Sequence, residues 1–403
     1  MLGKLPCRHL LPDRNDVAGA FGDFGTFAPL VVGMISVCQL NPANVMIVFG
    51  SCYLLGALVY RMPISVQPMK AIAALAIAGG ATMGAISGSS LTIGVAILVL
   101  TITGSLEWFA KMTPRVAVRG IQLGLALTLV MTSIRFMRKT GTMSVLGIDI
   151  PYYALTILSF VMVAALANNR KIPSLFILIP MGMGLAAAQE PFSKLITIQP
   201  SIPALNPEIS FNSVVTGFMT LALPQIPLTI GNSVIATASL SLLLFPNKKT
   251  VTVRKLGFTL GIMNVLSSIF GGIPMCHGAG GLAAHYRFGA RTVAAPIVIG
   301  LFLVSLGLLY GKALTAILNL FPLPILGVIL FFSVLELALV ARDVTRKYEL
   351  LVAILVAAIC AFVPYGFLVG WPTGIILGRA LERKAQPLAK LVNTAGTSPQ
   401  IDC

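Results

Sequence analysis

The sequence predicts an all-α polytopic membrane protein with fourteen transmembrane segments, arranged as two inverted repeats of seven segments. Three observations lead to this fold class. Hydrophobic residues make up 57% of the 403 residues and charged residues only 10%, whereas a soluble domain carries about 25% charge. The mean hydropathy is +0.94. Two polar, helix-breaking stretches, at residues 63–70 and 274–281, interrupt otherwise apolar sequence, which is the pattern of a transporter with broken helices in both halves.

Apolar runs recur along the whole chain, most of them near the roughly 20 residues that a spanning helix needs. The predicted segments are 17–38, 43–60, 67–82, 91–109, 120–134, 152–167, 172–188, 213–236, 256–271, 277–288, 293–310, 322–340, 349–364 and 366–380. The third and the tenth are too short to span the membrane alone. We interpret them as half-helices preceded by short extended strands, because irregular backbone at membrane depth must be buried or line a cavity.

The distribution of basic residues fixes the expected orientation. With a cytoplasmic N-terminus, 22 of the 28 Lys and Arg residues fall on the inside, 5 fall outside, and Lys70 alone lies within the membrane. This asymmetry agrees with the positive-inside rule. Both termini are therefore expected in the cytoplasm. We expect the protein to lie in the lipid bilayer of the plasma membrane, although the sequence leaves the identity of the membrane open. The net charge of +16 reflects topology, and its dispersal over short loops excludes nucleic acid as a partner.

Neither a cleaved leader nor a metal centre is expected. Charged residues, from Lys4 to Asp16, interrupt the sequence before the first apolar run, so the first helix must act as its own insertion signal. The six cysteines lack the spacing of a zinc site or a disulfide framework. The sequence therefore predicts no metal and no cofactor.

A polar, proline-bearing stretch divides the chain almost in half. We assign residues 1–190 to the first seven-segment repeat, 191–212 to a linker, and 213–403 to the second repeat with a short cytoplasmic tail. Because seven is odd, the second repeat inserts in the opposite orientation. The first segment of each repeat also contains a polar break, at residues 22–26 and 224–227, which supports an inverted repeat.

This orientation brings two helix N-termini face to face near the membrane midplane. One helix starts near Pro68, a favourable first helical residue, and the other near His277 or Gly278. Each N-terminus carries roughly half a positive charge, and helix starts bind anions through their free N–H groups. Lys70 adds a full positive charge, and glycines at 278, 280 and 281 allow close approach to the backbone. A tetrahedral dianion such as molybdate or sulfate suits this site.

Four motifs in these regions resemble those of the molybdate and sulfate transporter family, which is related to the SulP anion transporters. They are GDFGTFAP at 22–29, PISVQPMKAIAA at 63–74, PQIPLTIGNSVIA at 224–236 and PMCHGAGGLAAHYRFGAR at 274–291. The resemblance implies the seven-plus-seven fold of the uracil permeases, with segments 1–4 and 8–11 forming a substrate-carrying core and the others a gate. The chain ends about 25 residues after its last segment, so no STAS domain is expected.

The candidate site residues come from these motifs. The predicted substrate-binding set is Thr26, Gln67, Pro68, Lys70, Gln225, Thr229, Asn232, His277, Gly278, Ala279, Gly280 and Gly281, and the proton-coupling candidates are Asp23 and His277. An intramembrane carboxylate indicates function by default, although Asp23 could instead cap a helix. Lys70 could snorkel to an interface. The glutamines and small polar residues could serve helix packing, and His277 could be structural.

Three residues outside this set have simpler interpretations. His285 is expected to face the cytoplasmic interface beside Arg287. Glu107 and Glu336 lie near predicted cytoplasmic helix ends, where pairing with Lys111 or Arg342 at helical spacing would explain them.

The sequence thus predicts a secondary active transporter of molybdate, coupled to protons and working by elevator or rocking alternating access. A sulfate transporter and an anion channel or exchanger of the same fold remain alternatives. A nucleobase permease would need acidic residues where this chain has Gln225 and His277. An enzyme would need a nucleophile with its base or a metal cluster, and neither is visible. The sequence leaves the oligomeric state open, with a homodimer as one option.

Overall fold

The computed structural model describes residues 13–108, 113–166, 175–189, 200–205 and 208–395. The first part of the chain forms mainly helices. They are α1 (Arg14–Ala20), α2 (Phe24–Cys38), α3 (Pro42–Tyr60), α4 (Lys70–Gly79), α5 (Met83–Ile102), α7 (Arg115–Met137), α8 (Tyr152–Leu166) and α9 (Leu175–Ala187), with strands β1 (Gln67–Pro68), β2 (Thr142–Val145) and β3 (Ile148–Pro151).

The second part repeats much of this order. Its elements are α11 (Phe211–Gly217), η2 (Phe218–Ala222), α12 (Leu223–Leu228), η3 (Thr229–Ala236), α13 (Thr237–Leu244), α14 (Val253–Ile269), β4 (Met275–Cys276), α15 (Ala279–Arg287), α16 (Ala294–Asn319), α17 (Leu323–Leu339), η4 (Val340–Asp343), α18 (Lys347–Phe362) and α19 (Gly366–Ala395). In both parts a long helix is followed by a two-residue strand and then by a helix of nine or ten residues.

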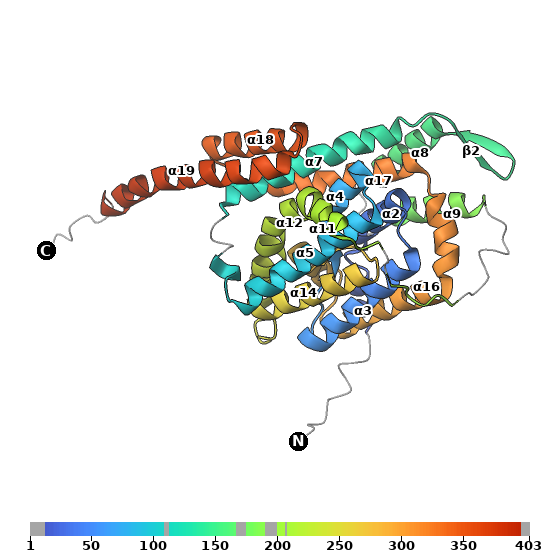
Figure 1. Ribbon diagram of the computed structural model, residues 1–403. Helices are drawn as coiled ribbons and strands as arrows, with labels where there is room; N and C mark the ends of the chain where they lie inside the picture. The colour runs from blue at the N-terminus through green and yellow to red at the C-terminus, as the bar shows by residue number, and fades with distance from the viewer. Residues whose placement is uncertain (1–12, 109–112, 167–174, 190–199, 206–207, 396–403) are drawn as a thin grey trace, which may run out of the picture.

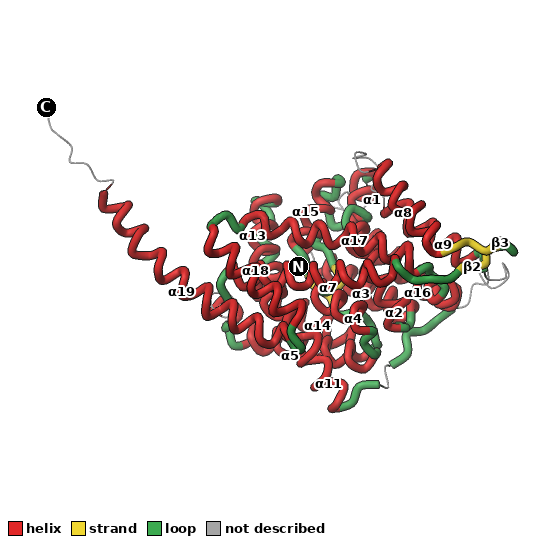
Figure 2. Tube along the Cα trace, turned by 90° about the horizontal axis from the view of Figure 1, so that it is seen from above, coloured by secondary structure: helices red, strands yellow, loops and turns green. Residues whose placement is uncertain are grey.

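The helices form two layers (Figure 1). In one layer α17, α18 and α19 each contact α7, α18 also contacts α19, and α8 lies against α17. In the other layer α3 packs on α16, and α14 packs on α5. Helix α4 contacts α7 of the first layer and α5 of the second, and α12 contacts α4, α7 and α19. Seen from above, the C-terminal part of α19 runs away from the rest of the molecule (Figure 2).

Glycine pairs explain the close packing inside the second of these layers. A Cβ atom on Gly50 of α3 would lie 2.5 Å from the carbonyl oxygen of Gly300 on α16, and one on Gly300 would lie 3.0 Å from the Gly50 oxygen. The same reciprocal arrangement joins Gly94 of α5 and Gly261 of α14, at 3.0 and 3.1 Å. Small residues let membrane helices approach until their backbones touch. The two helix pairs are therefore built in the same way.

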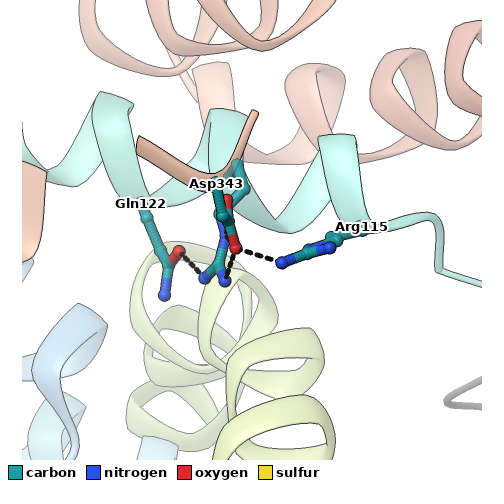
Figure 3. A network of polar contacts seen from close by, with 4 residues as sticks. Arg115, Gln122 and Asp343 are labelled. Atoms are coloured by element: carbon teal, nitrogen blue, oxygen red, sulfur yellow. Dashed lines mark hydrogen bonds and ion pairs between the residues drawn. The ribbon is translucent and has the colours of Figure 1, made fainter. Parts of the chain in front are cut away.

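A polar network holds the other layer together at one end (Figure 3). The Asp343 carboxylate, at the end of η4, accepts hydrogen bonds from the guanidinium of Arg119 on α7 at 3.0 and 3.1 Å from Nε. Arg115 also pairs with Asp343, and Arg119 donates to the amide oxygen of Gln122 at 2.8 Å. These contacts fasten the segment after α17 to the start of α7.

Many predicted helices agree with the observed ones to within a few residues, but several regions differ. Helices α16 and α19 run on to Asn319 and Ala395, well past the predicted ends at 310 and 380, and the helical stretch predicted to end at 236 continues to Leu244. The fourth predicted segment, 91–109, starts eight residues late, because Thr82 caps α5 by accepting from the Ala85 N–H. The hairpin of β2 and β3 was not expected. Six described helices are long and apolar enough to cross a membrane, and four further apolar helices are shorter, so the count of fourteen segments stays a prediction.

The expected break at residues 224–227 is wrong, because the helix continues through it. Pro224 and Pro227 lie within α12, which is flanked by the π-helical segments η2 and η3. Proline has no N–H to donate to the carbonyl four residues earlier. The chain accommodates the two prolines by widening its turns on either side, and such π-helical segments occur often at functional sites. The break at residues 22–26 has a counterpart in the turn between α1 and α2.

Candidate anion-binding site

The strand pair β1 and β4 positions the starts of two helices. Gln67 pairs with Cys276 and Pro68 with Met275 in antiparallel register, and the Met69 N–H donates to the Pro274 carbonyl at 2.8 Å. Because the strands are antiparallel, the chain leaves them in opposite directions. Helix α4 begins at Lys70 on one side and α15 begins at Ala279 on the other. Both helices therefore run away from the strand pair and point their N-termini toward it.

Neither helix start is capped by its own N-cap side chain. The N-cap residues are Met69 and Gly278, and neither has a side-chain oxygen that could accept from the first turn. The first N–H groups of a helix have no partner within the helix itself. The sequence therefore places two positive helix ends beside one strand pair and omits the residues that usually neutralise them.

Lys70 is the first residue of α4 and is half-buried. Among the described residues its ammonium group forms no ion pair or hydrogen bond, and its charge acts on the buried thiol of Cys276 on β4. A cation at the N-terminus of a helix is unfavourable for the helix dipole. An anion bound at this position would offset both positive charges at once.

Gln225 reaches the start of α4 from the neighbouring helix α12. Its amide oxygen accepts from the Ala71 N–H at 2.8 Å, and its amide nitrogen donates to Thr229 at 3.1 Å. Gln225 is buried, with 2% of its surface exposed. The residue therefore serves as a cap from a distance and links η3 to α4, which places Gln225 and Thr229 beside the predicted site.

The start of α15 is shaped by glycines. A Cβ atom on Gly278 would lie 1.7 Å from the Gln67 amide oxygen, and one on Gly281 would lie 2.4 Å from the Ser65 hydroxyl. Gly280 is exposed and has open space where a Cβ would be, and Ala279 is half-buried. The first turn of α15 is thus accessible on the side of Gly280 and packed tightly against β1 on the other.

Asp23 and Gln67 form a buried pair between α2 and β1. The Gln67 amide nitrogen lies 2.8 and 2.6 Å from the two carboxylate oxygens of Asp23. Only 3% of Asp23 and 1% of Gln67 are exposed. Asp23 is also the N-cap of α2, but its side chain makes no cap hydrogen bond there. Its carboxylate lies against α15, because a Cβ on Gly281 would be 2.7 Å from Oδ2.

His277 is fully buried and both of its ring nitrogens have partners. Nδ1 lies 2.8 Å from the Ser65 carbonyl oxygen, which can only accept, so Nδ1 carries the proton. Nε2 lies 3.0 Å from the Thr259 hydroxyl, which also contacts the Tyr60 hydroxyl. The Tyr60 ring packs edge-on against the imidazole, with centroids 5.4 Å apart. These contacts hold the β4–α15 connection against α3 and α14.

The expectation that His285 faces an interface is wrong. Its side chain is 1% exposed, and Nδ1 lies 2.6 Å from the carbonyl oxygen of Gly19 on α1. Helix α1 covers it, which the apolar spacing of the sequence did not indicate. Of the acidic residues set aside above, Glu107 is exposed. Its suggested partner Lys111 and the side chain of Glu336 lie outside the described residues.

The remaining predicted residues lie on the elements around the strand pair. Pro68 is buried within β1. Thr26 is half-buried in the first turn of α2, and Asn232 is half-buried in η3, where its carbonyl accepts from Thr237 at 3.0 Å. The structure therefore gathers residues from α2, β1, α4, α12, η3 and α15 into one region.

Sequence reasoning missed three polar residues that build this region. Ser65 donates to the Gly278 carbonyl at 3.0 Å, and Thr237 donates to the His277 carbonyl at 2.7 Å. The side-chain amide of Asn264 on α14 bonds to both backbone groups of Met275 in β4: it accepts from the Met275 N–H at 2.9 Å and donates to the Met275 carbonyl at 2.8 Å. A buried amide within an apolar helix was the available signal for Asn264, since such groups require partners.

An apolar cavity of about 260 Å³ lies elsewhere, among α2, α9 and α16. Its lining includes Phe24, Met46, Met183 and Phe302, and it contains no charged or hydrogen-bonding side chain. Such a lining does not suit a dianion, since a buried charge needs paired or hydrogen-bonding groups. This cavity therefore does not match the predicted anion site, and the strand pair stays the predicted one.

Comparison with known sequences shows the family. The family described as "Molybdate transporter of MFS superfamily" matches residues 15–129 and 217–337, which include all four motifs and every residue of the candidate site. The chain belongs to the molybdate transporter family. Members of this family are similar over nearly the whole chain. Molybdate transporter 2 of Arabidopsis thaliana is 32% identical, covering 86% of this chain and 83% of that protein.

Two further members of the molybdate transporter family extend this likeness. Molybdate transporter 1 of Arabidopsis thaliana is 30% identical, over 92% of this chain and 90% of its own. Molybdate transporter 1 of Chlamydomonas reinhardtii is 27% identical, over 88% and 90%. These relatives are transporters, as the sequence predicted, and the expected resemblance is confirmed.

The fold resembles that of solved anion transporters. The transmembrane domain of the cyanobacterial bicarbonate transporter BicA superposes with a TM-score of 0.61 at 12% identity, covering 93% of this chain and 98% of that domain. The inward-facing murine Slc26a9 anion transporter superposes with a TM-score of 0.62 at 14% identity, covering 94% and 72%. This member of the molybdate transporter family therefore has an SLC26-like fold, as the predicted relation to SulP proteins implied.

Proposed function

We propose that this protein moves molybdate across a membrane by proton-coupled secondary active transport. One observation carries the proposal: two helix N-termini whose own N-cap residues provide no side-chain cap meet at the β1–β4 pair, and Lys70 stands at one of them. Helix starts offer N–H groups and partial positive charge to an oxyanion. The names of the related transporters identify molybdate as the substrate to test first.

The charge of the substrate requires an energy source. Bringing one negative charge into a cell with a negative interior is opposed by about 2.3 kcal/mol per 100 mV. A dianion meets twice that opposition, so accumulation needs co-transported cations, and protons are the proposed choice. The proposed site contains one described carboxylate that could accept a proton, Asp23.

The position of Asp23 supports this role. Its carboxylate lies against Gly281 in the first turn of α15, where an ionised carboxylate is stabilised by the helix dipole. A bound dianion would need the same positive helix end and would be repelled by the carboxylate. Protonation of Asp23 removes this repulsion, and binding of the anion in turn favours the protonated form. Binding of the proton therefore raises the affinity for the anion, and binding of the anion raises the affinity for the proton.

Alternating access follows from the two layers under this proposal. Residues 1–190 and 213–403 are taken as two inverted repeats, and the matching glycine pairs of α3–α16 and α5–α14 support that division. The layer that holds α3, α5, α14, α16 and the anion site would move against the layer of α7, α8, α17, α18 and α19. Elevator and rocking motions both fit this arrangement.

The test is uptake of labelled molybdate by purified protein in proteoliposomes. An inward proton gradient should drive saturable accumulation above the equilibrium level, and a protonophore should stop it. Tungstate and sulfate should compete, because the helix ends act on any small tetrahedral dianion, and uracil should not. Uptake that does not saturate and ignores the proton gradient would indicate a channel. Strong uptake of sulfate without uptake of molybdate would show that sulfate, and not molybdate, is the substrate.

A further inference from the structure

The nitrogen and the oxygen of the Gln67 side-chain amide lie in different environments. Its nitrogen donates to both oxygens of Asp23. An ionised carboxylate only accepts hydrogen bonds, so the negative charge of Asp23 dictates that the nitrogen faces it. The orientation of the Gln67 amide is therefore set by the protonation state of its neighbour.

The other end of the amide points at the start of α15. The Gln67 oxygen is buried and has no hydrogen-bond partner among the described residues. It occupies the space beside the N-cap residue Gly278, where a Cβ atom would be 1.7 Å away. A buried carbonyl oxygen without a donor costs free energy. It also turns a negative dipole end toward the helix terminus at which the anion is proposed to bind.

Protonation of Asp23 would reverse this arrangement. A protonated carboxyl group can donate one hydrogen bond, and the Gln67 oxygen would accept it if the amide turned by half a revolution. The same rotation would give the orphaned oxygen a partner and aim the amide N–H groups at the α15 start. In that position the amide donates to a bound oxyanion, and hydrogen bonds to charged groups are the stronger kind.

We propose that the Gln67 amide is the switch that couples protonation of Asp23 to anion affinity. The inference rests on the proposed function and names the residue through which the proton acts. With Asp23 ionised, Gln67 presents an acceptor to the site and the anion binds weakly. With Asp23 protonated, Gln67 presents a donor and the anion binds tightly. Gln67 is a binding residue in one state and a blocking residue in the other.

Other charged or titratable groups surround the pair and enter the pH dependence. Tyr53 on α3 and Cys276 on β4 interact electrostatically with Asp23, and Lys70 at the start of α4 acts on Cys276. Among the histidines on the β4–α15 side, His277 has its ring nitrogens engaged by Ser65 and Thr259. His285 donates toward Gly19. None of these donates to the Gln67 oxygen.

The experiment measures molybdate binding to the purified protein by calorimetry over a series of buffers from mildly acidic to mildly alkaline pH. Affinity of the wild type should rise as the pH falls. Asp23→Asn is neutral and has an amide N–H that can donate to the Gln67 oxygen, so it should allow the tight-binding orientation at every pH. We expect its affinity at the alkaline end to exceed that of the wild type by about tenfold to a hundredfold, with little pH dependence.

A double-mutant cycle separates the amide switch from simple loss of charge. Gln67→Met keeps the volume but removes the amide, so Asp23→Asn should raise affinity much less in that background. Equal gains in both backgrounds would overturn the switch and leave charge alone as the cause. Gln122→Met removes a buried amide from the Arg119 network instead and should leave the pH dependence unchanged. Loss of that dependence in Gln122→Met would also count against the proposal.

A second measurement covers the case in which Gln67→Met does not fold. Infrared difference spectra of the wild type should show a glutamine carbonyl band that moves to lower frequency on acidification, because the oxygen gains a hydrogen bond. The shift should be absent in Asp23→Asn. No shift in the wild type would overturn the switch. Molybdate binding that is independent of pH would overturn it as well while leaving molybdate transport standing, whereas no binding at any pH would remove the proposed function itself.

Discussion

Lys70 is the residue whose role can be tested most simply. Lys70→Ala removes the only cation that the sequence places within the membrane, and hydrogen bonds to charged groups are worth about 1.5 to 3 kcal/mol. Molybdate affinity should therefore fall by about tenfold to a hundredfold, measured by calorimetry. Lys70→Arg should recover part of the loss, since a planar guanidinium does not replace a compact ammonium. Unchanged affinity in a well-folded Lys70→Ala protein would show that Lys70 has a structural role and does not bind the anion.

The glycines of α15 allow a matched comparison. A Cβ on Gly281 would overlap the Ser65 hydroxyl at 2.4 Å and Asp23 at 2.7 Å, whereas one on Gly280 would meet nothing within 4 Å. Overpacking of this kind costs about 1 to 3 kcal/mol, and alanine in a helix is favoured over glycine by roughly 0.5 to 1 kcal/mol. Gly281→Ala should lower the unfolding temperature in detergent, and Gly280→Ala should keep or raise it. Equal effects of the two substitutions would contradict the packing described here.

At this scale the sequence predicted which residues gather but not what each side chain does. Helix-breaking motifs and an intramembrane charge were enough to single out Asp23, Gln67, Lys70 and Gln225. That Gln67 bonds Asp23 and that Gln225 caps Ala71 depends on contacts between segments 44 and 154 residues apart. Periodicity contains no information on such pairs. The prediction that these residues bind the substrate stays a prediction.

At the scale of elements, the Asp343 network should make the stability of the layer that contains α7 and α17 depend on pH in the acidic range. Hydrogen bonds from Arg119 chiefly, and from Arg115, hold the pKa of the Asp343 carboxyl below its ordinary value. A carboxyl whose pKa is lower in the folded state stabilises the fold above its unfolded pKa, and this contribution disappears as the pH falls through the folded pKa. Asp343→Asn should therefore lower the free energy of unfolding at neutral pH by about 1 kcal/mol. The difference from the wild type should vanish in strong acid.

The two arginines of the network provide a control for each other. Arg119 has 18% of its side chain exposed and Arg115 has 71%, and exposed ion pairs contribute little. Arg119→Gln should lower the unfolding temperature at neutral pH more than Arg115→Gln does. The opposite order would show that burial does not set the strength of these pairs.

Helix positions were predictable because apolar runs of spanning length leave few alternatives in a membrane. The exceptions have physical causes. The prolines at 224 and 227 usually end a helix, but here π-helical turns on both sides keep the chain helical. The hairpin of β2 and β3 lies in the connection between α7 and α8, where no apolar run gave a signal. Short extended strands before α4 and α15 were expected, but their pairing with each other across about half the chain was not, because neither stretch contains a signal for its partner.

For the whole molecule, Asp23 should decide whether transport can run uphill. Asp23→Asn removes the proposed proton carrier but keeps a side chain that can bond to Gln67. In proteoliposomes this variant should bind and exchange molybdate yet fail to accumulate it against a gradient, whereas wild-type accumulation should increase as the outside is acidified. Proton-driven accumulation that persists in Asp23→Asn would exclude Asp23 as the carrier and turn attention to His277.

The location of the bound anion tests the central claim most directly. Molybdenum is a heavy scatterer, so an experimental structure of the protein with molybdate can place it without ambiguity. The account predicts a single anion between the starts of α4 and α15, within hydrogen-bond distance of Lys70 and of backbone N–H groups in residues 278–281. Molybdate bound instead at the arginines of the Asp343 network, or at any position away from the β1–β4 pair, would contradict it.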